Sequence, residues 1–401
     1  METSTSQRDA EISMLQNAIS QVSIGRKSFF RYITANDVGR TGGHQCGFYV
    51  PKGGASVLFE ELGIRGENKE KLVRIVWPNN ISTDSRFIYY GRGTRDEYRI
   101  TRFGRNFPYL QDEYVGSLLI ITQIDTNEYV GHILSRDIDI DGFFEYFNIS
   151  PTSSECLIEP NKIMPYEQGD FLRLFLSKYD DFPSSRIMAF WGQKYKLCCE
   201  SITRSAILGN PDRALKEWID AEYLLYQALE EKIYAPIYTT PFGSVNQLVE
   251  LANTILNRRK SRAGKSLEHH LERILQRFQL QFEAQVQTEG KKRPDFIFPS
   301  SKAYHDPSYA SDRLIFLAAK TTCKDRWRQI INEADRIEHK FLFTLQKGIS
   351  TSQLQEMTRE RVSLVVPQSH ISSFDAGYQS KILSLQSFIH HVQTIQGQRN
   401  S

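Results

Sequence analysis

The chain has 401 residues, which is too long for one ordinary hydrophobic core, so two domains are the natural expectation. Its net charge of only +3 excludes binding of nucleic acid through a uniformly basic surface, so any such affinity must come from local clusters of cations. The composition, with 40% hydrophobic residues, gives no sign of disorder.

The five cysteines include no CxxC pair, which indicates neither a zinc knuckle nor a disulfide framework and fits a reducing cytosol. The first 30 residues hold Arg8, Asp9, Glu11, Arg26 and Lys27 without the apolar core of a signal peptide. No later stretch reaches transmembrane length. We therefore expect a cytoplasmic protein.

The first half of the chain is expected to be mainly β. From about residue 31 to 166 the sequence predicts short strands, as at 47–50, 72–77, 87–90 and 118–124, separated by turns rich in Gly, Asn and Asp. A polar stretch with Asp180 and Asp181 before Pro183 marks the join to the second half. We predict a first domain over 1–176, a linker over 177–183 and a second domain over 184–401.

Two segments of the first domain carry candidate DNA-contacting groups. Residues 35–45 are polar and Gly-rich, which indicates either an ordered functional loop or a plain surface loop. Five arginines lie within 92–105 among acids that can accept a hydrogen bond from cytosine, which suits sequence-specific contact in a DNA groove. His44 has no second metal ligand at a convincing spacing. The predicted contact residues are Asn36, Asp37, Arg40, His44, Arg92, Arg95, Glu97, Arg99, Arg102 and Arg105.

The second half of the chain alternates helical and strand patterns. Apolar residues recur every three or four positions at 184–191, 212–228, 244–260 and 265–278, which predicts helices. Short apolar runs at 295–298, 314–319 and 364–366 are typical of buried strands. Helices around a small central sheet follow from this alternation.

A basic segment, residues 257–265, lies between two of the predicted helices. Such a loop can hold a phosphate backbone, and a merely solubilising loop is the alternative. Its cations are Arg258, Arg259, Lys260, Arg262 and Lys265.

Four charged residues of the second half form a candidate catalytic set. Asp295 opens one predicted strand and Lys320 closes another, so the two converge if these strands are neighbours. Glu333 lies beside the apolar stripe of a helix predicted over 325–339, and Glu268 borders the buried side of its helix. Burying a carboxylate beside apolar side chains costs free energy unless a cation or a metal ion lies next to it. The alternative is a pair of buried Glu–Arg contacts with Arg273 or Arg336.

This set predicts metal-dependent hydrolysis of a phosphodiester. Asp295 and Glu333 would bind Mg²⁺, and Lys320 would orient or deprotonate the attacking water. Glu268 would tune the metal from a second position. The neighbouring Lys324, Asp325 and Arg326 suit a G·C-rich major-groove edge, although such a triplet alone is more often a solvated helix start.

The second half resembles the EcoRII family of type II restriction endonucleases. The resemblance lies in FGSV at 242–245, NRRKSRAGKSLE at 257–268, PDF at 294–296, KTTCKDRWRQ at 320–329 and NEAD at 332–335. The first half is similar through AND at 35–37, TGGHQ at 41–45 and RITR at 99–102. The helix predicted over 212–228 matches poorly, and its Trp218, Tyr223 and Tyr226 are residues that could stack on an extruded base or belong to the core.

The resemblance implies a PD-(D/E)XK nuclease fold in the second domain, an α/β restriction-endonuclease-like fold with a central mixed sheet flanked by helices. It implies a DNA-binding pseudobarrel in the first domain, of the kind found in plant auxin-response regulators. The common pattern puts an acid two positions before the lysine, where this chain has Ala318, and a related subgroup that cuts around a CC/GG core takes that acid from the following helix, which is where Glu333 is expected to lie. By the same resemblance Glu268, Asp295, Lys320 and Glu333 become catalytic, and residues 324–326 read CC:GG pairs.

Enzymes of this family cleave duplex DNA before CCWGG, act as homodimers and bind a second site through the N-terminal domain, which otherwise blocks the cleft. A cognate cytosine methyltransferase is expected in the same system, without direct contact. The leading prediction is thus a Mg²⁺-dependent, site-specific endonuclease at CCWGG or a close relative. A DNA-binding regulator with an inert nuclease domain is the alternative. A structure-specific repair nuclease is disfavoured by two base-reading clusters.

Overall fold

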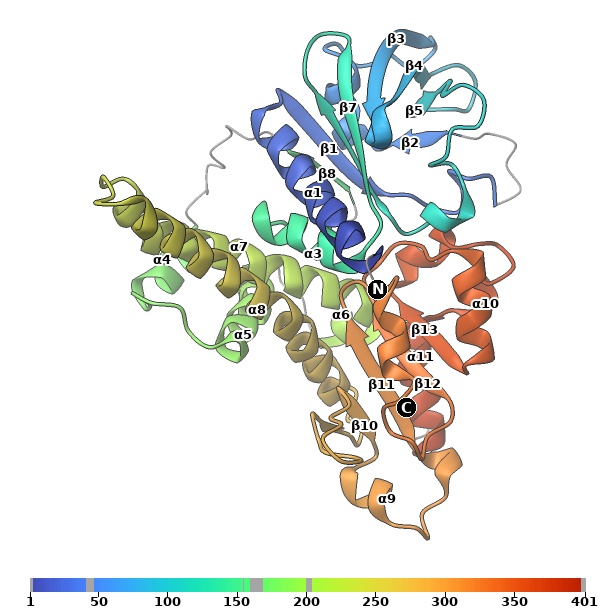
Figure 1. The fold of residues 1–401 in the computed structure, drawn as a ribbon. Helices are drawn as coiled ribbons and strands as arrows, with labels where there is room; N and C mark the ends of the chain where they lie inside the picture. The colour runs from blue at the N-terminus through green and yellow to red at the C-terminus, as the bar shows by residue number, and fades with distance from the viewer. Residues whose placement is uncertain (1–2, 41–46, 154, 159–168, 200–203, 398–401) are drawn as a thin grey trace.

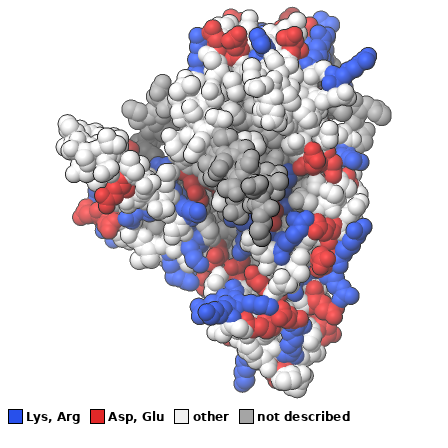
Figure 2. Space-filling view, viewed as in Figure 1, with Lys and Arg blue, Asp and Glu red and all other residues white. Residues whose placement is uncertain are grey.

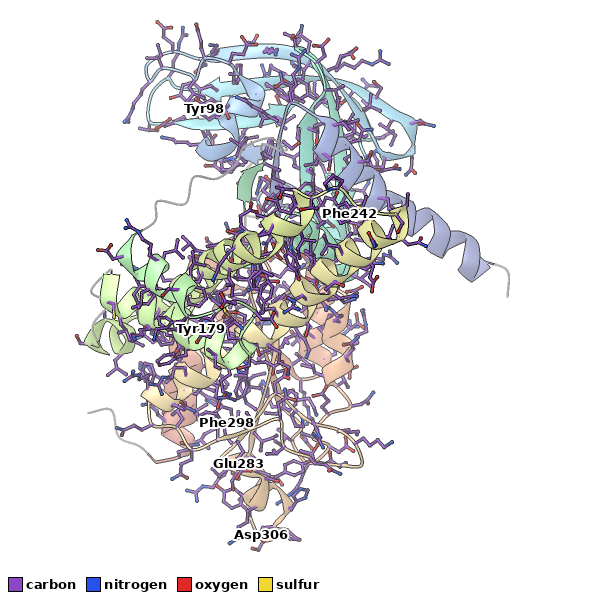
Figure 3. All side chains as sticks on the ribbon, turned by 90° about the vertical axis from the view of Figure 1, so that its left-hand side faces the viewer. Tyr98, Tyr179, Phe242, Glu283, Phe298 and Asp306 are labelled. Atoms are coloured by element: carbon purple, nitrogen blue, oxygen red, sulfur yellow. The ribbon has the colours of Figure 1, made fainter. Side chains whose placement is uncertain are left out.

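The computed structural model describes residues 3–40, 47–153, 155–158, 169–199 and 204–397. Two β-sheets organise this part of the chain, one of eight strands in the first half and one of six in the second. Figure 1 shows the first sheet at the top, the second below it, and a long pair of helices running out to one side. Tyr98 lies in the first sheet and Asp306 at the opposite end of the molecule (Figure 3).

The first sheet has the strand order β2-β5-β4-β3-β7-β6-β1-β8. Every neighbouring pair in it is antiparallel except β3 with β7, which is parallel. Its strands are β1 (Lys27–Tyr32), β2 (Phe48–Val50), β3 (Lys69–Trp77), β4 (Ile81–Tyr90), β5 (Glu97–Thr101), β6 (Leu118–Gln123), β7 (Glu128–Leu134) and β8 (Glu155–Ile158). The prediction of a mainly β first half is confirmed.

One apolar cluster receives side chains from all the strands of this sheet. It includes Phe29 of β1, Phe48 of β2, Trp77 of β3 and Leu119 of β6, and Leu157 of β8 packs against it. The edge strand β8 also packs against the short 3₁₀ turn η1 (Lys52–Gly54) that follows the other edge strand β2. The sheet therefore curls around its own core, and its two ends approach each other.

Two helices cover the outside of this curled sheet. They are α1 (Thr3–Ile24) and α3 (Asp137–Tyr146), and α2 (Ala55–Leu58) follows η1. Val22 of α1 and Phe143 of α3 share a buried cluster with Phe30 and Ile120 of the sheet. Figure 1 shows α3 beneath the sheet and close to the helices of the second half, and α3 contacts α8.

The second sheet is mixed, with the order β14-β13-β12-β11-β10-β9. Strands β11 to β14 run parallel, whereas β10 is antiparallel to both β9 and β11. The strands are β9 (Glu283–Ala284), β10 (Phe296–Phe298), β11 (Ile315–Lys320), β12 (Lys340–Thr344), β13 (Val362–Val366) and β14 (Leu383–Ser384). The three predicted strands and the mixed sheet are confirmed.

Helices flank both faces of the second sheet, which explains why its strands read as continuous apolar runs. One face packs against Trp218, Leu271 and Phe388, and the other packs against Trp327 and Leu354. The helices of this half are α4 (Asp170–Ser177), α5 (Ser185–Cys199), α6 (Arg204–Gly209), α7 (Pro211–Tyr238), α8 (Val245–Arg277), α9 (Ser301–His305), α10 (Thr351–Arg359) and α11 (Leu385–Ile395). Among the described residues, no helix has the length and hydrophobicity needed to cross a membrane.

The helix α4 packs with the second half of the chain. Its Leu172 and Phe175 share a buried cluster with Met188 and Trp191 of α5 and Leu229 of α7. Because its apolar face is covered by these helices, we propose that the domain boundary lies before α4. The first domain predicted over 1–176 and the linker predicted over 177–183 would then shift toward the N-terminus.

Two local predictions are wrong. The basic segment 257–265 is not a loop, because one helix, α8, runs through it. Gly264 costs about 1 kcal/mol in a helix interior, but the buried Ser266, Leu267 and Leu271 pack this part of α8 into the core. The stretch 325–339 is not an α-helix either. It forms a 3₁₀ turn, η5 (Arg326–Ile330), followed by irregular turns in which Ala334 has a φ of 51°.

Candidate active site

Asp295 and Lys320 lie at adjacent ends of two paired strands. Asp295 immediately precedes β10 and Lys320 ends β11. The antiparallel register of Phe296 with Leu317 sets Asp295 opposite Ala318, two residues before Lys320 and on the same face of the sheet. The Lys320 Nζ lies 3.3 Å from Asp295 Oδ2, which also accepts the backbone N–H of Ala319 at 2.8 Å. The Asp295 residue is only 7% exposed. Two rigid strands thus fix a carboxylate and an ammonium group together.

Glu268 reaches the same place through an intermediary that the sequence did not indicate. The side-chain amide of Gln285, which follows β9, donates to Asp295 Oδ1 at 2.9 Å and to Glu268 Oε2 at 3.2 Å. Lys265, one turn earlier on α8, donates to the same Glu268 oxygen at 3.0 Å. The predicted candidates Glu268, Asp295 and Lys320 therefore belong to one connected network.

Glu333 borders this network from the turns that follow η5. The side chains of Asp295 and Lys320 face the side of the sheet on which Trp327 and Ile330 pack, because strand residues alternate in direction. Partial burial raises the pKa of Glu333, and the negative charge of Asp295 raises it further, whereas Lys320 opposes the shift. The structure thus brings the fourth predicted residue into the electrostatic field of Asp295 and Lys320.

The alternative of buried Glu–Arg pairs does not match the contacts of the two arginines. Arg336 donates to the carbonyl oxygens of Ala303, at 3.3 Å, and of Tyr304 and Tyr309. Arg273 donates to Gln276 at 3.3 Å.

The donor chemistry of the site fits a hard divalent cation. Asp295 and Glu333 offer carboxylate oxygens, and a cation between them would offset both the burial of Glu333 and its smaller repulsion from Asp295, which together raise the pKa of Glu333. Within the described ranges, no group of three or more His, Cys, Asp or Glu side chains is arranged to hold a metal ion. A two-carboxylate site matches Mg²⁺, which keeps several waters and often takes further ligands from a substrate phosphate.

The predicted base-reading triplet lies between the two domains. Lys324 is 7% exposed, and its ammonium donates to the carbonyl oxygen of Glu113 at 2.8 Å and to Ser117 Oγ at 2.7 Å. Burial lowers the pKa of Lys324 to about 8. The contacts come from the turn before β6 in the first domain. Lys324 is therefore closed off from any other partner in this arrangement.

The helix α3 supplies carboxylates to the rest of the triplet. Asp137 accepts the backbone N–H groups of Lys324 at 2.9 Å and of Asp325 and Arg326 at 3.0 Å each. Asp141, one turn later, pairs with the Arg326 guanidinium and accepts from Thr322 Oγ1 at 3.0 Å. Burial raises the pKa of Asp137, and Asp325 adds to the shift. The acidic face of α3 thus lies against the backbone of the triplet and the side chain of Arg326, whereas the side chain of Asp325 is exposed.

The basic residues of α8 divide into two groups. Arg259 bonds to Glu230 and to the backbone oxygens of Glu145 and Tyr146, so it joins α8 to the end of α3. Arg262 is 6% exposed and lies between the aromatic rings of Tyr223 and Tyr226, with its carbon Cζ 3.8 and 4.0 Å from their centroids. Neither arginine is placed to hold a phosphate, which corrects the prediction for these two.

The other three cations of the segment 257–265 remain accessible. Lys260 and Lys265 are exposed, and Arg258 is partly exposed beside Asp181 and the ring of Phe182. On the face in Figure 2, positive and negative side chains alternate over the second domain without an extended patch of one sign. Local clusters, rather than overall charge, must therefore provide any affinity for a polyanion.

Of the first-domain candidates, two have structural roles. Asp37 is fully buried and accepts from Arg31 Nη1 and Thr34 N, both at 2.8 Å. Arg99 is 6% exposed and pairs with the partly buried Glu97 at 3.3 Å. Burial corrects the prediction of direct DNA contact for Asp37 and Arg99. A threonine three positions before an aspartate is a turn-forming pattern that could have indicated the role of Asp37.

The remaining first-domain candidates that the structure describes lie near the surface. Asn36 is partly buried, and His44 lies outside the described residues. The exposed candidates are Arg40, Arg92, Arg95, Arg102 and Arg105.

The three aromatic residues of α7 that were candidates for base stacking belong to the core. Trp218 and Tyr226 are each 1% exposed and Tyr223 is 6% exposed. The core interpretation of these side chains is therefore confirmed for this arrangement.

The acids Asp137 and Asp141 were missed by the sequence reasoning, although their spacing of four on a helix was a detectable signal.

Comparison with known proteins covers both halves of the chain. The family model described as "Restriction endonuclease EcoRII, N-terminal" matches residues 23–140, and the model "EcoRII C terminal" matches residues 226–389. The type II restriction enzyme EcoRII of Escherichia coli is 35% identical over 386 residues, which covers 91% of this chain and 94% of the relative.

Two solved structures are similar to part of the chain. A complex of the restriction endonuclease PspGI with substrate DNA has a TM-score of 0.45 and 15% identity, and covers 54% of this chain and 95% of its own. Metal-depleted Ecl18kI with uncleaved, modified DNA has a TM-score of 0.45 and 16% identity, and covers 58% and 86%. Since both family models and the Escherichia coli relative extend over the two domains, the chain belongs to the EcoRII family of type II restriction enzymes.

Proposed function

We propose that the protein is a Mg²⁺-dependent endonuclease that cleaves duplex DNA at CCWGG or a closely related site with a CC/GG core. The observation that carries this proposal is the convergence of Glu268, Asp295, Lys320 and Glu333 from four separate segments of the chain. Such a set of acids around one lysine serves phosphodiester hydrolysis, and family membership supports the same reaction.

Each residue of the set has a distinct role in this proposal. Asp295 and Glu333 would hold Mg²⁺, and the Ala319 N–H keeps Asp295 Oδ2 in place. When bound, Mg²⁺ lowers the pKa of a water molecule and neutralises charge on the phosphate. Lys320 orients or deprotonates the attacking water, whose attack leaves a 3′-hydroxyl and a 5′-phosphate. Glu268 would influence the metal-binding Asp295 indirectly, because the side chain of Gln285 lies between the two acids.

The segment that follows β11 would recognise the bases of the target site. Lys324 and Arg326 can each address O6 and N7 of guanine, and Asp325 can accept from the amino group of cytosine. Lys260, Lys265 and Arg258 would contact phosphates. Because Lys324 is only four residues beyond Lys320, base reading and cleavage are coupled through one strand end.

We propose that the first domain is a DNA-binding pseudobarrel that takes a second copy of the site. The sheet that curls around an apolar cluster supports this, and so do the exposed Arg92, Arg95, Arg102 and Arg105 on the segments around β5. In the arrangement described, Asp137 and Asp141 cover the triplet, which supports a closed state that is released when the first domain binds DNA. Cleavage of both strands would use a homodimer, since each chain carries one candidate site, and a cytosine methyltransferase would protect the host.

The test is to incubate the protein with a plasmid carrying several CCWGG sites. Site-specific double-strand cleavage is expected with Mg²⁺ and none with EDTA. Absence of cleavage with both Mg²⁺ and Mn²⁺, alongside retained DNA binding, would instead favour the regulator with an inert nuclease domain. Sequencing the ends cut from a random library then defines the target and its central base pair.

A further inference from the structure

The residue Gln285 occupies an unusual place beside the candidate active site. It follows the short strand β9 and has a φ of 54°, a left-handed conformation that costs about 1 kcal/mol or more for a residue other than glycine. Its backbone N–H donates to the carbonyl oxygen of Asp295 at 3.2 Å. The chain thus holds a long polar side chain where glycine would be the least strained residue.

The side chain of Gln285 joins two acids. Its Nε2 atom lies 2.9 Å from Asp295 Oδ1 and 3.2 Å from Glu268 Oε2. Ionised carboxylates only accept hydrogen bonds, so both contacts require the NH₂ end of the amide, whose two hydrogens match the two acceptors. The orientation of the amide therefore follows from the chemistry of its neighbours.

Glu268 depends on this bridge for its connection to the site. On the residues that the structure describes, its side chain is bonded to Lys265 on the same helix and to Gln285, and Gln285 alone links it to Asp295. An amide donor between two carboxylates also offsets part of their mutual repulsion. The position of Asp295 Oδ1, the oxygen not held by Ala319 and Lys320, is set by the same amide.

We infer that Gln285 is a positioning residue that couples Glu268 to Asp295, and that Glu268 influences the metal site through Gln285 rather than by direct contact. This inference rests on the proposed function. Residues that orient metal ligands in this way typically change metal affinity or activity by about 10- to 100-fold when they are replaced.

Two substitutions separate this role from a merely structural one. Gln285→Gly removes the side chain and relieves the left-handed backbone, so the variant should be at least as stable as the parent chain. Gln285→Glu keeps the shape but removes both donors and adds a third carboxylate. Gln287→Ala is the matched control, because Gln287 lies on the same connection between β9 and β10 and, among the described residues, its side-chain amide donates to the backbone oxygen of Gly290 and to neither acid.

The experiment measures Mn²⁺ binding to the full chain by calorimetry, the single-turnover rate of plasmid cleavage with Mg²⁺, DNA affinity without metal, and the thermal unfolding temperature. We expect Gln285→Gly to weaken Mn²⁺ binding or slow cleavage by about 10- to 100-fold, with unchanged DNA affinity and no loss of thermal stability. Gln285→Glu should be impaired at least as much, and Gln287→Ala should match the wild type. Glu268→Ala combined with Gln285→Gly should be no worse than Glu268→Ala alone, because both act through one bridge.

Wild-type rates and Mn²⁺ binding in Gln285→Gly would overturn the inference while leaving the proposed function intact. Effects of the two substitutions that multiply would also overturn it, since Gln285 and Glu268 would then act independently. A wild-type chain that neither binds Mn²⁺ nor cleaves DNA would refute the proposed function and this inference together.

Discussion

Replacing Asp137 by alanine should open the contact that covers the base-reading triplet. The Asp137 side chain is fully buried and accepts three backbone N–H groups of residues 324–326, at 2.9, 3.0 and 3.0 Å. Truncation of one partner in a buried, hydrogen-bonded charged contact costs about 2–5 kcal/mol. Burial raises the pKa of Asp137, so the negative charge contributes less than usual to the contact, and the cost of the truncation lies at the lower end of this range. A loss of about 2 kcal/mol shifts the closed-to-open equilibrium roughly 30-fold.

The assay for this prediction is cleavage of a plasmid that carries a single target site, where no second site can release the first domain. The Asp137→Ala variant should cut it several-fold faster than the wild type, and trypsin should separate the domains sooner. Asp139→Ala is the matched control, because Asp139 is a buried acid of the same helix that pairs with Arg136 of its own domain. Equal single-site rates for wild type and Asp137→Ala, or equal activation by Asp139→Ala, would refute the reasoning.

Three further predictions follow from contacts described above. Lys320→Ala should slow cleavage by about 10²-fold or more while DNA affinity is retained, and a cleavage rate near wild type would remove Lys320 from the mechanism. Arg262→Ala should lower the free energy of unfolding by about 3–5 kcal/mol, because it removes the cation 3.5 Å from Oε1 of the buried Glu222 and leaves that carboxylate with Ser266 and His270, which both bond to Oε2. Urea denaturation measures this, and an effect on DNA affinity alone would contradict it. The pH dependence of the closed state should show a minimum of stability between about pH 7 and 8. Burial raises the pKa of Glu145 to about 7, so the closed state loses stability as the pH rises toward 7. Burial lowers the pKa of Lys324 to about 8, so the closed state loses stability as the pH falls toward 8. Trypsin sensitivity at pH 6, 7.5 and 9 tests this, and Glu145→Gln should weaken the acidic side of the profile without abolishing it, because the raised pKa of Asp137 contributes in the same pH range.

Local sequence patterns predicted the parts of the second domain that depend on burial. The runs at 295–298, 314–319 and 364–366 form strands of a sheet that is covered on both faces. Because both faces are buried, the side chains on both sides of each strand are apolar, and the sequence shows a continuous apolar run. The placement of Asp295 and Lys320 at strand ends followed from the same runs, and the register of β10 with β11 brings them to 3.3 Å.

Patterns that depend on tertiary packing were misjudged. The stretch 325–339 carries a helical spacing of Trp327, Ile330 and Ala334, and all three are buried, yet the backbone forms a 3₁₀ turn and irregular turns. The apolar spacing reports that these side chains reach the core and does not fix the path of the backbone between them. In the same way, the cations at 257–265 read as a loop, whereas the packing of α8 against α7 carries one helix through them.

The sequence by itself determined the two-domain organisation, the strands of the catalytic half and the set Glu268, Asp295, Lys320 and Glu333, because chain length, strand burial and the chemistry of acids around a lysine are properties of local residues. Only the tertiary structure decided that Arg262, Asp37 and Arg99 are buried, that Gln285 joins two acids, and that Asp137 covers the triplet at 324–326. Those facts depend on which segments meet across long separations in the chain, and a side chain capable of binding DNA has the same sequence signature whether it faces solvent or another part of the protein.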